Sequence, residues 1–158
     1  MKKIALLTLA AMMAVSMSAQ SGKQLYKKYF DRDVIETVHL SGFMLRTAGR
    51  LAAVDMDGTD FSKFARSLKG MYVISAESAE ARTSLGADIR KIIRNEDLES
   101  LMEVNSDGQK TMMYINGKGD NVTELAIVTL GADDVTFVSI EGKMSRAELE
   151  RWAAEEGM

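Results

Sequence analysis

The sequence predicts an α+β fold, in which an antiparallel β-meander of about four strands is extended by one or two earlier strands and helices pack on the sheet. The first observation is residues 98–141, where four strand-like runs are separated by three clusters rich in Gly, Asp and Asn. These residue types favour tight turns. The second observation is that the segments before and after this region repeat apolar residues every three to four positions, which is typical of amphipathic helices.

Residues 1–19 have the pattern of a secretory signal peptide. A basic start, Lys2 and Lys3, precedes the apolar residues 4–15, and small residues then lead to a predicted cut after Ala19. A membrane-spanning helix would need about 20 apolar residues, which is more than this segment contains. We therefore expect an exported protein, located in the periplasm or associated with the cell envelope.

The rest of the chain, residues 20–158, has the length of a single domain. Without Lys2 and Lys3, 18 basic residues stand against 23 acidic ones, so the net charge falls from −3 to −5. A nucleic-acid-binding protein would need a dense basic surface, so that class of partner is disfavoured. The sequence contains no Cys, which excludes disulfides, thiolate metal sites and a lipid attached to a cysteine at the cut. No cofactor is predicted.

The elements around the meander follow from periodicity and from the serines that suit helix N-caps, Ser41, Ser78 and Ser145. Residues 34–40 and 71–75 read as strands. The final helix opens with the capping box Ser145-Arg146-Ala147-Glu148 and is expected to bury Leu149, Trp152 and Ala153. The other helices are expected at residues 23–30, 42–54, 60–69 and 79–94. Phe30 falls on the apolar face of the first of these, and Met44 on that of the second.

The meander strands alternate polar and apolar residues only in part. A sheet with one face in water would alternate more cleanly. The second face is therefore expected to be covered, either by the N-terminal helices or by a partner. The candidates for contact with a partner are Leu101, Met113 and Ile115.

The segment Asp55-Met56-Asp57-Gly58-Thr59 matches the DxDGT motif of haloacid-dehalogenase-type phosphatases, in which the first Asp accepts a phosphoryl group. That motif must follow a buried strand of a parallel sheet, whereas here it follows a segment with helical spacing. Asp55, Asp57 and Asp60 also lack the spacing of an EF-hand loop, although clustered carboxylates suit hard cations. They remain the candidates for a metal ion.

His39 is the only histidine, so Cys/His dyads and multi-histidine zinc sites are excluded. No nucleophile-elbow motif accompanies it, and its place in a short strand favours a solvent-facing side chain. No coherent catalytic set emerges, and the sequence favours a protein that is not an enzyme.

Three stretches resemble a known family: YKKYFDRDVIETVHLSGFML, KGMYVISAES and the meander with its continuation to GKMS. The chain is similar to the family called domain of unknown function 4252 (DUF4252). The resemblance implies export from a member of the Bacteroidota, and it brings no established activity and no functional residues. Many relatives resemble lipoproteins with a Cys at the cut, and this chain lacks that Cys.

The sequence thus predicts a non-catalytic exported envelope protein that binds a protein or peptide. The alternative is a small-molecule or metal-ion binder, or a hydrolase, that uses the loop of residues 55–60.

Overall fold

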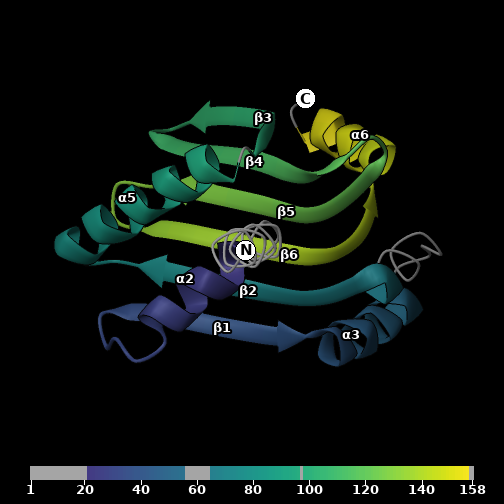
Figure 1. Ribbon diagram of the computed structural model, residues 1–158, viewed down its shortest axis with the longest axis horizontal. Helices are drawn as coiled ribbons and strands as arrows, with labels where there is room; N and C mark the ends of the chain where they lie inside the picture. The colour runs from purple at the N-terminus through teal and green to yellow at the C-terminus, as the bar shows by residue number, and fades with distance from the viewer. Residues whose placement is uncertain (1–20, 56–64, 97, 157–158) are drawn as a thin grey trace, which may run out of the picture.

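A computed structural model describes residues 21–55, 65–96 and 98–156 of the chain. In this part of the chain, six antiparallel strands form one sheet in the order β1-β2-β6-β5-β4-β3 (Figure 1). The predicted α+β fold is confirmed, with both earlier strands joined to the meander. The strands are β1 Ile35–Ser41, β2 Leu68–Ala76, β3 Glu99–Ser106, β4 Gln109–Lys118, β5 Asn121–Leu130 and β6 Val135–Ser145.

Strand β6 holds the two parts of the sheet together. It pairs with β5, its neighbour in the sequence, and also with β2, which lies far earlier in the chain. Its alternating residues Val135, Phe137 and Ser139 are buried on one face. Because β6 has a strand on each side, all of its backbone groups can enter the ladder.

Strand β2 begins earlier than the sequence predicts. Residues 60–69 were expected to form a helix that ends at Gly70, but Leu68 already pairs with Gly142 of β6 and Gly70 pairs with Ser41 of β1. Pairing with two neighbouring strands outweighs the local helical periodicity, which is a weak preference. Residues 65–67 are helical, and residues 56–64 lie outside the described part of the chain.

The turns of the meander use residues that accept a positive φ. Asp107 and Gly108 link β3 to β4 with φ of 53° and 79°, and Gly119 links β4 to β5 with φ of 59°. These are left-handed conformations that Gly and Asp adopt at little cost. A β-bulge between Ser100 and Met102 breaks the simple alternation expected for β3.

Two helices cover the first face of the sheet, which lies toward the viewer in Figure 1. Helix α2 (Ser21–Tyr29) lies over β1, β2 and β6, and helix α5 (Ala79–Asn95) crosses from β2 toward the β3 edge. Ser78 caps α5 as predicted, because its Oγ accepts a hydrogen bond from Ala81 N at 3.2 Å. The core of this face is formed by Leu25, Tyr29, Ile74, Leu85, Ile89, Val128 and Phe137.

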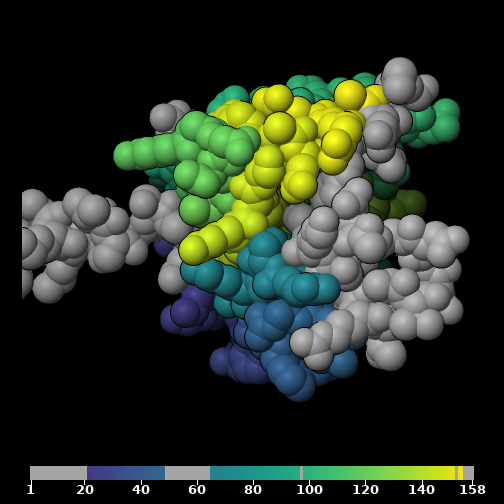
Figure 2. Space-filling model, turned by 90° about the vertical axis from the view of Figure 1, so that its right-hand side faces the viewer, coloured from purple at the N-terminus to yellow at the C-terminus, as the bar shows by residue number. Residues whose placement is uncertain are grey.

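The other two helices lie at one end of the sheet. Helix α3 (Gly42–Asp55) follows β1, and helix α6 (Arg146–Glu156) follows β6. Figure 2 looks at this end, with the C-terminal segment in yellow at the top and α3 in blue near the bottom. Leu149 of α6 and Leu45 of α3 belong to the core of the second face, together with Leu68, Ile115, Val122, Leu125 and Met144. Helices therefore pack against both faces.

Two caps match the sequence prediction. Met44 N donates to Ser41 Oγ at 3.3 Å, and Glu148 N donates to Ser145 Oγ at 3.5 Å. Leu149 and Ala153 are buried as expected, and the side chain of Trp152 lies outside the described residues. Across the described ranges, every helix is too short or too polar to cross a membrane.

Candidate functional site

Among the described residues, strand β1 forms one edge of the sheet, with β2 as its strand neighbour. It starts after a tight turn in which Arg32 N donates to Tyr29 O at 3.0 Å and Ile35 N donates to Arg32 O at 3.2 Å. Its seven residues then pair with β2 without a register shift, and Ser41 ends the strand by capping α3. The result is a regular edge strand held at both ends.

The inward side of β1 is fixed by aromatic packing. Ile35 is buried in the first-face core, and the ring of His39 stacks on Tyr72 with centroids 4.4 Å apart and an interplanar angle of 7°. Tyr26 of α2 adds a tilted contact to both rings. His39 is exposed, as the sequence predicts, and its ring stabilises the strand by stacking.

Exposed apolar side chains gather around this edge. We call Phe30, Val34, Val38, Phe43 and Met44 the β1 edge surface. These large hydrophobic side chains are between 48% and 69% exposed, and all fall within residues 30–44. Val38 lies on β1, and the other four residues lie in the segments at its two ends. Exposed apolar residues that are grouped in this way are candidates for an interaction surface.

Two members of the β1 edge surface were expected in the core. The helical spacing places Phe30 with Leu25 and Tyr29, but α2 ends at Tyr29 and leaves Phe30 in the following turn. Met44 was assigned to the buried stripe of the helix that begins at Gly42, but Leu45 is the residue that packs against the second-face core. Both differences arise because the position of a helix on the sheet, which spacing does not specify, decides which residues are buried.

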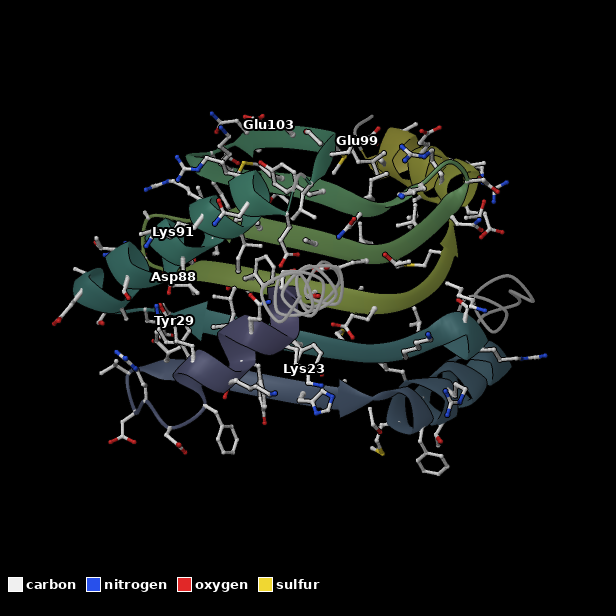
Figure 3. All side chains as sticks on the ribbon, in the orientation of Figure 1. Lys23, Tyr29, Asp88, Lys91, Glu99 and Glu103 are labelled. Carbon is white, nitrogen blue, oxygen red and sulfur yellow. The ribbon has the colours of Figure 1, made fainter. Side chains whose placement is uncertain are left out.

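The opposite edge strand, β3, has a different character. It carries the β-bulge, and its exposed Glu99 and Glu103 form ion pairs with Arg146 at 2.8 Å and with Lys110 at 2.5 Å. Figure 3 shows both glutamates along this edge. Bulges and charges on an edge strand prevent further pairing. Strand β1 has no bulge in its pairing, and its exposed side carries both Glu36 and Val38, so the two edges differ chiefly in regularity.

A buried carboxylate lies under the start of α2. Glu124 of β5 is 1% exposed, and its Oε1 accepts hydrogen bonds from Ser139 Oγ at 3.0 Å and from Ser21 Oγ. Its other oxygen, Oε2, has no partner within the described residues. Burial raises the pKa of Glu124, and the two serine hydrogen bonds oppose that shift.

Glu124 affects two further carboxyl groups. Burial and the nearby Glu124 raise the pKa of Glu96 to about 7. The same two causes raise the pKa of Glu141, although Lys23 and Lys69 oppose the change. Glu96 and Glu141 are half-buried, and the described ranges contain no group of three or more His, Cys, Asp or Glu that could hold a metal ion. They influence stability and its dependence on pH.

The sequence contained a signal for Glu124 that was not used. Glu124 alternates along one strand with Ala126 and Val128, which are both apolar. A glutamate in such a register is expected to be buried with hydrogen-bond donors. Ser139 lies on the neighbouring strand beside Ala126, two register pairs from Glu124's own partner Glu141.

The structure describes only some of the site residues proposed from the sequence. Asp55 is the last residue of α3, with its side chain outside the described residues, and Asp57 and Asp60 lie wholly outside them. Ile115 is 1% exposed within the second-face core, and Leu101 and Met113 are half-buried against it. Ile115 is thus a core residue, and its side chain is not accessible to a partner. Among the side chains that the structure describes, the exposed large apolar ones are those of the β1 edge surface.

Comparison with known proteins shows the family. No curated protein matches the chain. One solved structure, the solution structure of cyanobacterial PsbP (CyanoP) from Synechocystis sp. PCC 6803, is similar at 19% identity and a TM-score of 0.30. That match covers 57% of this chain and 66% of the other, just under two thirds of its length. The family model described as domain of unknown function (DUF4252) matches residues 26–152, which include the β1 edge surface and all six strands, and the chain therefore belongs to the DUF4252 family.

Proposed function

We propose that this protein is a non-catalytic binding module that captures an extended segment of another protein along strand β1. The observation that supports this proposal is the β1 edge surface, where five large apolar side chains surround a regular edge strand. The partner segment would add to the sheet as a seventh strand. This mode of recognition is common where a sheet edge is left unpaired.

Two physical features of β1 suit this role. Alternate residues of an edge strand point their backbone N–H and C=O groups away from the sheet, and these groups gain hydrogen bonds when a further strand is added. Apolar side chains at the edge gain burial at the same time, and Val38 lies in the middle of β1. The expected partner segment is therefore extended and carries apolar residues at alternate positions.

We further propose that the protein is exported and works in the periplasm or envelope without a lipid anchor. The pattern of residues 1–19 supports export, and the lack of Cys supports the absence of a cysteine-linked lipid. Mass spectrometry of the protein recovered from its own cells tests this directly. The mature chain is expected to begin at Gln20, whereas a chain that keeps Met1 would contradict export.

The binding proposal is tested with a matched pair of edge variants. Val38→Lys places a charge in the centre of the β1 edge, and Asn105→Lys places the same charge on the exposed side of the opposite edge strand, β3. Both proteins are exposed to a displayed library of extended peptides, and the selected peptides are titrated against them. We expect Val38→Lys to weaken binding by at least about tenfold, and Asn105→Lys to leave it unchanged.

Hydrogen exchange identifies where the peptide binds. A selected peptide is expected to slow the exchange of backbone amides within Ile35–Ser41 and to leave those of Glu99–Ser106 unchanged. Protection at β3 alone, or equal weakening by both variants, would contradict the proposal. Sedimentation of the protein without peptide tests for pairing between two copies at β1. If the protein forms a dimer and Val38→Lys dissociates it, then the segment that pairs with β1 belongs to a second copy of the chain, and the proposal of a peptide partner is wrong.

A further inference from the structure

A second site, separate from β1, lies between the C-terminal half of α5 and the strands β4 and β5. It is a cleft of about 270 Å³ on the first face of the sheet. Strands β2, β6 and β5 separate β4 from β1, so this cleft is remote from the β1 edge surface. Pockets for drug-sized ligands begin at about 300 Å³, so the cleft suits a smaller molecule.

Apolar side chains from three elements line most of the cleft. They are Ile89 and Ile93 from α5, Met112 from β4, and Val128 and Leu130 from β5. Such a lining favours an apolar chain or ring, because burial of apolar surface is the main source of affinity in a small pocket.

Gly86 keeps one wall of the cleft open. It is buried within α5, where glycine lowers helix stability relative to alanine. Close packing does not account for glycine at this position, since a Cβ built on Gly86 would have Arg90 Nη2 as its nearest neighbour, at 4.0 Å. The space that a side chain would occupy is left to the cleft.

The polar groups of the lining favour an anion. Arg90 comes from α5 and Lys110 from β4, and the lining contains no carboxylate. Arg90 is exposed and forms no ion pair with the described residues. Lys110 Nζ contacts Glu103 at 2.5 Å, in a pair whose side chains are 42% and 53% exposed. A pair so open to solvent is worth little and leaves Lys110 able to exchange partners.

Tyr114 supplies a hydroxyl group to the same lining. Its OH donates to Met112 Sδ at 3.4 Å, and a thioether sulfur is a weak acceptor. A carboxylate oxygen would be a much stronger acceptor for this hydroxyl. Within one cleft the structure therefore combines an apolar lining, two cationic groups and a weakly engaged hydroxyl donor.

We propose that this cleft binds a small amphipathic carboxylate of the medium-chain fatty acid type. The hydrocarbon tail lies against the apolar lining beside Gly86. The carboxylate interacts with Arg90 and accepts a hydrogen bond from Tyr114 OH, while Lys110 adds positive charge from the opposite side. This site is independent of the strand-binding function proposed above.

The test uses octanoate as the probe and the methionine methyl groups as reporters. Met112 lines the cleft, whereas the adjacent Met113 packs on the second face of the sheet and serves as an internal control. In protein labelled with 13C at the methionine methyl groups, octanoate is expected to shift the Met112 signal in a saturable manner at millimolar concentration. The Met113 signal is expected to stay in place. Octylammonium, which has the same tail and the opposite charge, is expected to produce no saturable shift.

Three variants separate the contributions of the head group and the tail. Arg90→Gln is expected to weaken octanoate binding by about tenfold, because a hydrogen bond to a charged group is lost. Arg94→Gln, one turn further along α5 and outside the lining, is expected to leave binding unchanged. Gly86→Leu fills the cleft in a helix position that favours leucine over glycine, so it is expected to fold and to abolish binding.

The proposal is overturned if Met112 shows no saturable shift with octanoate, or if octylammonium shifts it equally. It is also overturned if Arg90→Gln and Arg94→Gln bind octanoate alike. Both arginine variants keep the helix and its packing, so these outcomes are decisive even if Gly86→Leu does not fold.

Discussion

At the scale of single residues, the buried carboxyl groups are expected to make stability depend on pH. The folded protein binds the Glu96 proton with a pKa of about 7, against an ordinary value of 4.5. A carboxyl group whose pKa is raised by folding does not lower the free energy of unfolding while it is protonated in both the folded and the unfolded state. Stability is therefore expected to fall as pH rises from about 4.5 to about 7, and Glu124, whose pKa is also raised, adds to this decline.

Glu96→Gln is expected to remove part of that decline. The variant keeps the shape of the side chain without its charge, so its unfolding midpoint should exceed that of the native protein at about pH 8 and match it at about pH 4. Thermal unfolding followed by circular dichroism at both pH values provides the measurement. Glu77→Gln, at an exposed position, is the control. If the midpoints of Glu96→Gln and the native protein differ by the same amount at both pH values, Glu96 does not contribute to the decline in stability.

A second residue-scale prediction concerns the polar contact between α2 and α5. Tyr29 is fully buried, and its hydroxyl donates to Asp88 and lies 3.0 Å from Ser84 Oγ, while Lys28 Nζ contacts Asp88 at 2.6 Å. Figure 3 shows Tyr29 and Asp88 side by side where the two helices meet. Burial opposes the charged form of Asp88, but the hydrogen bonds from Lys28 and Tyr29 outweigh it and lower the pKa of Asp88.

Tyr29→Phe is expected to lower the free energy of unfolding by about 1–3 kcal/mol, because it removes a donor to a charged acceptor. Urea denaturation at neutral pH measures this loss. Tyr26→Phe, in the same helix, removes a hydroxyl of a half-buried ring that packs by aromatic contacts, and it is expected to change stability by less than about 0.5 kcal/mol. Equal losses in the two variants would contradict the role assigned to the Tyr29 hydroxyl.

At the scale of the elements, two helical glycines are expected to respond in opposite ways to alanine. A Cβ on Gly22 would collide with Ser139 Cβ and Oγ on β6, so glycine allows α2 to approach the sheet. Gly22→Ala is expected to destabilise the fold by about 1–3 kcal/mol through overpacking. Gly86→Ala meets open space in α5 and is expected to stabilise the protein by about 0.5–1 kcal/mol. Chemical denaturation of the two variants checks both signs.

The elements also show which parts of the fold follow from local sequence. Ser41, Ser78 and Ser145 cap helices where their side chains and the following periodicity predict them, because capping depends on neighbouring residues alone. The start of β2 at Leu68 and the exposure of Phe30 and Met44 were not predicted. Each depends on contacts with segments distant in the sequence, so a local pattern does not determine it.

The sequence did not locate the candidate site. It directed attention to the meander as the surface for a partner, and there Ile115 is buried. The β1 edge surface depends on the strand order, in which β1 is last and β3 is at the opposite edge. Strand order is a property of the whole sheet, and the sequence of β1 does not say whether the strand has one neighbour or two.

At the scale of the whole molecule, the first-face core is expected to carry a large share of the stability. Phe137 of β6 and Ile89 of α5 are at most 2% exposed and belong to the same core. Phe137→Ala is expected to cost about 3–5 kcal/mol and Ile89→Ala about 2–5 kcal/mol. Equilibrium unfolding in urea measures both losses. A negligible change in either midpoint would show that the residue does not support the core.

The position of β6 has a consequence for the order in which the chain acquires its structure during synthesis. The strands β1 and β2 are made early and β3, β4 and β5 later, but the two groups meet only through β6, near the C-terminus. Until that strand has left the ribosome, β2 and β5 each lack one of their two neighbours, and the sheet remains in two parts. Pairings between such distant segments also form slowly. The six-stranded sheet can therefore be completed only when almost the whole chain has been made.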